Sequence, residues 1–165
     1  MKIRVIAAAA LALALTVPVE GHAQWSLKMH GGYDLDAEEF LIGAGVEFSI
    51  PGAAISGVPL TFAPAFDYYP GLAGSSFFVM DLDAHYPFPA KGMSPYVGGG
   101  MYVSRTSVDF GAFGRVSDTD VGLNIKGGAT FGTSSQVRPF TEARLRIGSV
   151  STLTLKAGLS IQMGN

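Results

Sequence analysis

The regular alternation of apolar and polar residues is the strongest signal in this sequence, and it is clearest in residues 137–147. In this segment, VRPFTEARLRI, every charge falls on an even position and the odd positions are uncharged. Successive side chains of a β-strand point to opposite faces, so one face of such a strand would carry all the charges. Strands of soluble sandwiches also alternate. One alternating strand therefore does not show what surrounds the sheet, and the number of times that the pattern recurs along the chain has to be considered.

The same two-sided pattern recurs about eight times, which is more than one small soluble core requires. Glycine, proline and acidic clusters separate the repeats and predict turns, with Pro51-Gly52 opening one of them. The longest predicted loop is 105–119. The predicted strands are residues 25–33, 40–50, 58–69, 76–88, 95–104, 120–131, 137–147 and 151–163.

Charged residues are sorted strictly onto one face of these strands, provided that 95–104 is not extended to Arg105. The uncharged face therefore meets a medium that cannot solvate charge, as hydrocarbon cannot: a lipid-facing Arg or Lys costs ~2–4 kcal/mol near the bilayer midplane. Closing the sheet would also satisfy the backbone hydrogen bonds, as lipid requires. We predict an all-β, eight-stranded antiparallel up-and-down transmembrane β-barrel. The charged face would line its lumen with Lys28, Glu47, Asp67, Asp81, Asp83, Lys126, Arg138, Glu142, Arg144, Arg146 and Lys156.

The predicted lumen is a plug, because eight strands enclose a space only wide enough for side chains. We assign all the lumen charges above except Arg138 to an ion-pair network, with Glu142 as its central node. Pro64 falls in the middle of a strand and is predicted to mark a bulge. Glycines are predicted to make room for long side chains on neighbouring strands at Gly43, Gly45, Gly98 and Gly100.

The first 23 residues have the pattern of a signal peptide. Lys2 and Arg4 precede an apolar run, residues 6–17, and Gly21-His22-Ala23 provides small residues at a cleavage site. The run is shorter than the roughly 20 residues of a membrane-spanning helix. We predict that residues 1–23 are removed on export and that residues 24–165 form one barrel domain.

Composition narrows the function classes. Only 15% of residues are charged, and the mean hydropathy is positive. The absence of cysteine excludes a disulfide framework and a lipid-anchored N-terminal cysteine. A formal net charge of −2 gives no basic surface for nucleic acid, which we do not expect as a partner.

The mature chain resembles the small outer-membrane β-barrel family of the OmpA transmembrane-domain and OmpX type. The similar phrases are GAGVEFSIPG, PAFDYYPG, SPYVGGGMYVSRTS and RPFTEARLRIG. The resemblance implies a barrel in the outer membrane of a Gram-negative bacterium, in contact with outer-membrane lipid and inserted by the outer-membrane insertion machinery. It implies membrane-stabilising, adhesion or surface-interaction roles. The chain departs from the family at its last residues, 161–165, which lack the final aromatic residue of the family's assembly signal.

Candidate chemical sites are few, and we predict no catalytic residue, cofactor or metal. Asp81 and Asp83 fit an ion-pair network better than an acid/base pair, and His30 and His85 lack the spacing of metal ligands. The acidic segment 34–39 lacks the glycine and spacing of a calcium loop. Within the predicted loop 105–119, a possible partner-binding site is formed by the interface-favoured residues Phe110, Phe113 and Arg115.

The preferred function is therefore that of a non-enzymatic outer-membrane barrel with its termini on the periplasmic side, structural or binding a partner through its outer loops. One alternative is a narrow solute pore. Another is a membrane-embedded lipid-modifying hydrolase, although no histidine lies beside an outward-facing serine near the outer rim. A soluble ligand-carrying barrel would need the opposite arrangement, with apolar residues inside.

Overall fold

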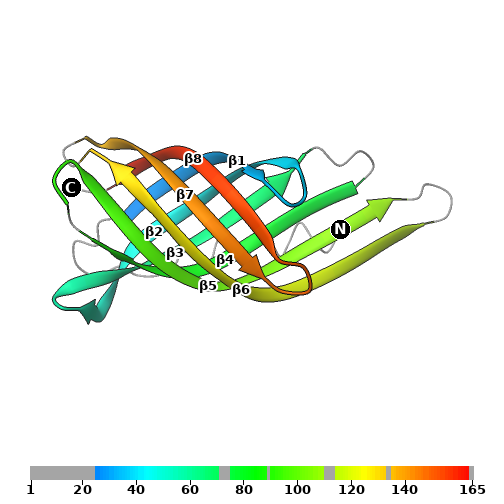
Figure 1. The fold of residues 1–165 in the computed structure, drawn as a ribbon, viewed down its shortest axis with the longest axis horizontal. Coiled ribbons are helices and arrows are strands. Elements are labelled where there is room, and N and C mark those ends of the chain that lie inside the picture. The colour runs from blue at the N-terminus through cyan, green and yellow to red at the C-terminus, as the bar shows by residue number, and fades with distance from the viewer. Residues whose placement is uncertain (1–24, 71–74, 89, 110–113, 133–134, 164–165) are drawn as a thin grey trace.

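The computed structural model describes residues 25–70, 75–88, 90–109, 114–132 and 135–163. Eight antiparallel strands form a closed barrel in which each strand pairs with its neighbours in the chain and β8 pairs with β1 (Figure 1). The fold predicted from the sequence is confirmed. Its strands are β1 (Trp25–Asp34), β2 (Glu39–Ile55), β3 (Val58–Tyr69), β4 (Ser75–Pro87), β5 (Met93–Asp109), β6 (Arg115–Phe131), β7 (Val137–Ile147) and β8 (Thr152–Met163).

The described residues contain no helix long and apolar enough to cross a membrane, a finding that does not bear on strands. The alternation read from the sequence is the inside–outside alternation of the barrel wall. In β7, for example, Phe140, Glu142, Arg144 and Arg146 are buried, whereas the odd-numbered residues between them are exposed. One face of each strand therefore supplies the lumen and the other supplies the outer surface.

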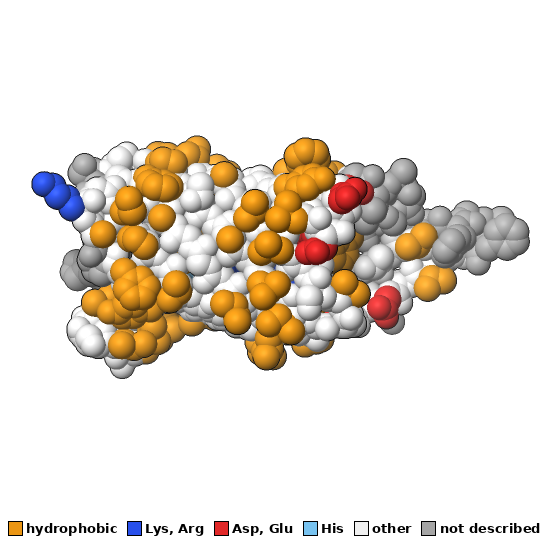
Figure 2. All heavy atoms as spheres, in the orientation of Figure 1, with side chains coloured by type: hydrophobic (Ala, Val, Ile, Leu, Met, Phe, Trp, Pro, Cys, Tyr) orange, Lys and Arg blue, Asp and Glu red, His pale blue; other side chains and the backbone are white. Residues whose placement is uncertain are grey.

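The outer surface of the barrel is apolar, and the buried interior is largely polar. Figure 2 shows apolar side chains spread over the body of the molecule, with acidic side chains toward one end. A soluble ligand-carrying barrel would have the opposite arrangement. The outer surface includes these large apolar side chains, each at least 40% exposed: Met29, Ile42, Phe66, Leu82, Val97, Met101, Val103, Val121, Leu123, Ile125, Leu145, Leu155 and Leu159.

The two ends of the barrel differ. We call the end at which β1 begins and β8 finishes the terminal end, and the opposite one the distal end. The β2–β3, β4–β5 and β6–β7 connections lie at the terminal end, and the other four lie at the distal end. Two hairpins project beyond the wall, β2–β3 at the left of Figure 1 and β5–β6 at its right.

The turn predicted to open at Pro51-Gly52 begins later in the chain. β2 continues through these residues to Ile55, and the chain reverses at Ser56-Gly57. The pairing register of β2 and β3 shifts between Ser49 and Ala54. Such an irregularity lets an edge segment accommodate proline without ending the strand.

The predicted loop 105–119 is largely wrong, because β5 and β6 extend through most of it. Thr106 pairs with Asp118 and Val108 with Val116, so the connection is a long hairpin. The β-branched residues of this segment favour strands and explain the extension; they are Thr106, Val108, Val116 and Thr119. The bulge predicted at Pro64 is wrong as well, since the register is the same on both sides of it, from Gly45 opposite Ala65 to Phe48 opposite Phe62.

Candidate functional site

The ten charged residues that we assign to the ion-pair network point into the barrel, where they form what we call the lumen network. Their side chains come from every strand except β5 and retain between 0 and 14% of their exposure. Each member makes at least one ion pair with another. The lumen network consists of Lys28, Glu47, Asp67, Asp81, Asp83, Lys126, Glu142, Arg144, Arg146 and Lys156.

Toward the distal end, two cations hold two carboxylates. The Arg146 guanidinium lies 2.5 Å from an Asp67 oxygen and 2.9 Å from an Asp81 oxygen. Lys156 Nζ lies 2.6 Å from the same Asp67 oxygen. Arg146 also donates to the Tyr69 hydroxyl at 3.0 Å. These contacts link β3 and β4 to β7 and β8 across the lumen, so they brace opposite walls.

At the centre, Arg144 lies among three carboxylates. Its guanidinium is 2.8 Å from both Asp83 and Glu142, and it is in direct contact with Asp81. Lys126 adds a bond of 3.2 Å to Asp83 and a longer contact of 3.8 Å to Glu142. Arginine suits this position because its planar fork of donors can engage several oxygens at once.

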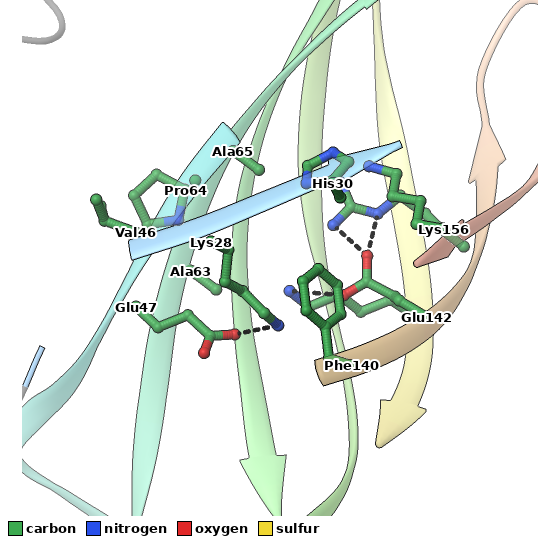
Figure 3. Close-up of a pocket in the computed structure, with 13 residues that line it drawn as sticks. Lys28, His30, Val46, Glu47, Ala63, Pro64, Ala65, Phe140, Glu142 and Lys156 are labelled. Atoms are coloured by element: carbon green, nitrogen blue, oxygen red, sulfur yellow. Dashed lines mark hydrogen bonds and ion pairs between the residues drawn. The ribbon is translucent and has the colours of Figure 1, made fainter. Parts of the chain in front are cut away.

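Toward the terminal end, Lys28 lies between a carboxylate and aromatic rings. Figure 3 shows Lys28 reaching toward Glu47, with the Phe140 ring beside it. The Nζ–Oε1 distance to Glu47 is 2.7 Å. Nζ is 4.0 Å from the centre of the Phe140 ring and 4.8 Å from that of Tyr96, so both rings contribute cation–π attraction. The ammonium group is thus held on two sides within a buried site.

Glu142 shares its predicted role as central node with Asp81. Glu142 contacts Arg144, Lys126 and the Tyr96 hydroxyl, which donates at 3.0 Å. Its cross-strand neighbour Lys156 turns to Asp67 instead. Asp81 has three cationic partners, Arg144, Arg146 and, at 4.0 Å, Lys156.

Two histidines are part of the lumen rather than of its surface. His30 Nε2 lies 2.7 Å from Asp67. The His85 ring stacks on Tyr96 with the ring centres 4.6 Å apart, and its Nε2 lies 3.8 Å from Glu47. Both rings point inward from β1 and β4 and away from the outer surface.

Sequence reasoning missed the neutral and loop residues that complete the lumen network. Tyr96 and Asn124 are buried on the polar face that the alternation assigns to the lumen, but the predicted network contains charged residues alone. Asp34 belongs to the predicted acidic loop, yet it is buried. It accepts hydrogen bonds from the Tyr69 hydroxyl at 3.3 Å and from the backbone N–H of Ala37 at 3.0 Å. It therefore caps the β1–β2 turn and borders the network.

Glycine positions explain how long side chains fit. A methyl group added at Gly43 would collide with the His30 ring and with Asp67 Oδ1, and one at Gly100 would lie 2.8 Å from both Cα and Oδ1 of Asp83. Gly98 stands in the same way beside His85. The absent side chains on β2 and β5 leave the volume that the charged side chains occupy.

Little free space remains in the lumen beside Lys28 and Glu142. A cavity bordered by Lys28, Glu47, Phe140 and Glu142 leaves about 20 Å³ in which a water molecule can be centred. This is room for one or two waters. The arrangement in this region is therefore that of a plug braced by ion pairs.

Other candidate sites lie partly outside the described residues. Phe110 and Phe113 lie outside the described residues, and Arg115 is the first residue of β6, with a side chain that is also outside the described set. In the acidic segment, Asp36 accepts the backbone N–H of Leu153 at 2.6 Å, which ties the β1–β2 connection to the start of β8. Within the described ranges, no three His, Asp or Glu side chains are grouped as metal ligands.

Comparison with known proteins shows the fold. No protein-family model matches the sequence, and no curated protein matches it. The N-terminal β-barrel domain of Pseudomonas aeruginosa OprF is similar, with 14% identity and a TM-score of 0.69 over 87% of this chain and 100% of that one. Ail, the attachment invasion locus protein of Yersinia pestis, has 12% identity and a TM-score of 0.61 over 88% and 100%.

The outer membrane enzyme PagL is also similar, with 11% identity and a TM-score of 0.51 over 85% of this chain and 99% of that one. At these identities the likeness concerns the fold and not the activity. The chain has the fold of the small eight-stranded outer-membrane β-barrels.

Proposed function

We propose that this chain is a non-enzymatic outer-membrane β-barrel protein that serves membrane structure or a surface interaction. The observation that carries the proposal is an apolar outer surface around a lumen filled by the ion-paired lumen network. Such a molecule is stable in a bilayer, exposes no lumen to solutes and leaves only its ends free to contact partners. The shared fold with OprF and Ail supports the outer membrane of a Gram-negative bacterium as its location.

Export and orientation follow from the same proposal. Residues 1–23 act as a cleaved signal peptide, the outer-membrane insertion machinery receives residues 24–165, and the terminal end faces the periplasm. The distal end then faces outward with the projecting β5–β6 hairpin. The predicted partner-binding residues Phe110, Phe113 and Arg115 would lie in this outer hairpin.

The charge of the distal end indicates the kind of surface partner. Its connections and the projecting β5–β6 hairpin contain six acidic and two basic residues, counted over residues 35–39, 70–74, 105–120 and 148–151. Ail has been crystallised with the heparin analogue sucrose octasulfate. An acidic end would repel such a polyanion, so we infer that a partner here is basic.

The refolded protein should pass through a heparin column and be retained on immobilised polylysine at low salt, with retention lost as salt screens the charges. Retention on heparin would refute this choice of partner.

PagL makes a lipid-modifying hydrolase the alternative to weigh. A nucleophile and its base must reach lipid or its headgroups. In the described part of the chain, His30 and His85 both point into the lumen, against Asp67 and Tyr96. This supports the non-enzymatic proposal.

The first experiment is to refold residues 24–165 in detergent and compare boiled and unboiled samples by gel electrophoresis. A compact band that shifts on boiling and requires detergent is the expected result. A soluble monomer without detergent would overturn the proposal. The same sample in a planar bilayer should give no steady single-channel conductance, and a steady conductance would establish the narrow pore instead.

A further inference from the structure

The β2–β3 hairpin continues past the barrel wall as a two-stranded ribbon, residues 49–60, which we call the ribbon. Among the described residues, β1 pairs with β2 as far as Phe48, and β4 pairs with β3 as far as Thr61. Beyond these points β2 and β3 pair only with each other, as at Ala54 and Pro59. The ribbon sequence, SIPGAAISGVPL, contains no charged residue. Edges exposed to water usually carry charge, so this composition requires an explanation.

The ribbon is a defined hairpin. Ser56 and Gly57 at its tip have φ angles of 49° and 79°. Two consecutive positive φ angles in a two-residue loop are characteristic of the type I′ turn, whose twist matches that of the paired strands. Pro59 lacks a backbone donor and blunts one edge, which disfavours a protein partner that joins as a further strand.

The apolar surface of the ribbon is continuous with that of the barrel. Ile55 is 53% exposed at the tip, and Ala54 and Pro59 are exposed beside it. At its base, the rings of Phe48 and Phe62 pack edge to face with centres 5.3 Å apart. Figure 1 shows the hairpin diverging from the barrel body at the lower left, and Figure 2 shows apolar side chains over that corner and onto the barrel.

We propose that the ribbon lies against the bilayer leaflet at the terminal end, with Ile55 in contact with lipid. From Ser49 to Ile55 an extended strand spans about 20 Å, enough to carry the tip into water if the ribbon stood upright. The register shift between Ser49 and Ala54 provides a bend, as strand irregularities do. An uncharged ribbon that continues the lipid-facing surface fits the lipid interface. This inference rests on the proposed function only in that the barrel spans a bilayer.

The test places a single tryptophan in the ribbon. Trp25, the one tryptophan of the chain, is replaced by Phe, and Ile55→Trp is added. Two matched variants carry Ile125→Trp, in the middle of the apolar surface and 59% exposed, or Lys91→Trp, in the exposed β4–β5 connection at the same end. Each variant must first show the heat-shifted compact band. Tryptophan emission is then measured in vesicles of ordinary and of brominated phosphatidylcholine.

The expected result is that the Ile55→Trp variant emits at shorter wavelength than the Lys91→Trp variant. Bromine placed near the headgroup should also quench half or more of the emission intensity of this variant. The Ile125→Trp variant should be quenched most by bromine near the bilayer centre, because its tryptophan would face the hydrocarbon.

The outcomes separate the ribbon proposal from the proposed function. An unquenched Ile55→Trp variant beside a quenched Ile125→Trp variant would overturn the ribbon proposal alone. An unquenched Ile125→Trp variant would instead refute the membrane barrel. If the emission of the Ile55→Trp variant depended on protein concentration, a second copy would cover the ribbon, which also overturns the proposal.

Discussion

Individual residues of the lumen network are expected to contribute unequally to stability, and Asp81 should matter most. Its side chain is fully buried, contacts Arg144 and Arg146, and accepts a bond from Asn124 at 3.2 Å. Asp81→Ala leaves these arginines short of a carboxylate in a buried site. Removing one partner of a buried ion pair costs about 3–5 kcal/mol. Urea unfolding of the refolded barrel, followed by gel shift, should show a loss of this size.

Asp118→Ala is the matched control, because Asp118 is an exposed carboxylate on the projecting part of β6. Its loss should change the free energy of unfolding by less than about 0.5 kcal/mol. Equal effects of the two substitutions would show that the lumen network contributes nothing specific to stability.

Glycine spacing gives a second residue-scale prediction. Gly100→Ala places a methyl group against the backbone oxygen of Leu82 and 2.8 Å from Asp83, and overpacking of this kind costs about 1–3 kcal/mol. At Gly127 the nearest atom to an added methyl group is 3.7 Å away, an ordinary contact. Gly127→Ala should therefore be nearly neutral in the same urea titration. A Gly100→Ala substitution that left the free energy of unfolding unchanged would mean that the residues around it shift without cost.

Parity along each strand was enough to predict which residues enter the lumen, but not which ones pair. Lys156 bonds to Asp67, 89 positions away in sequence, and Arg146 reaches Asp67 and Asp81 from the opposite wall. Such contacts depend on the register and tilt of strands around the closed barrel, which no local pattern contains. Adjacent strands bearing Lys126 and Lys156 favour Glu142 as the central node, whereas in the structure Asp81 has more cationic partners.

Among the strands, local sequence signals succeeded where turn residues coincide with the barrel rim and failed where strands extend past it. The predicted bounds of β3 and β7 agree with the structure. Pro51-Gly52 is a strong local turn signal, yet β2 runs through it, because pairing with β3 continues beyond the register shift. Likewise, the segment 105–119 is polar. A polar sequence does not distinguish an irregular loop from a hairpin that is exposed to water.

The projecting β5–β6 hairpin should be dispensable for folding. Deleting residues 109–115 and joining the cross-strand partners Val108 and Val116 by Asn-Gly creates a two-residue turn that suits a hairpin, and it leaves the β4–β5 pairs in place. The shortened protein should keep the heat-shifted band and, if the hairpin binds the surface partner, lose that binding. As a control, the same turn joining Tyr102 to Gly122 removes strand from the barrel wall and should lower the urea midpoint. An unfolded first variant would contradict the proposed separation of folding from binding.

At the scale of the whole molecule, the decisive property is that the barrel carries its polar groups inside and its apolar groups outside. In water, this arrangement would leave a large apolar surface exposed while burying charges, which is costly on both counts. In a bilayer, the apolar surface meets hydrocarbon, and the buried charges compensate one another. The same sequence is therefore expected to have one stable fold in lipid or detergent.

This property can be tested with two residues of β6 that are equally exposed but lie at different positions along the barrel axis. Leu123 is 61% exposed on the barrel wall, and Val116 is 62% exposed on the projecting part of β6. If lipid surrounds the wall, Leu123→Arg brings a charge into hydrocarbon and should cost up to about 2–4 kcal/mol, depending on its depth. Val116→Arg faces water and should cost almost nothing. Urea unfolding in vesicles measures both. Equal, small effects would place the two residues in the same medium, and the membrane assignment would then be wrong.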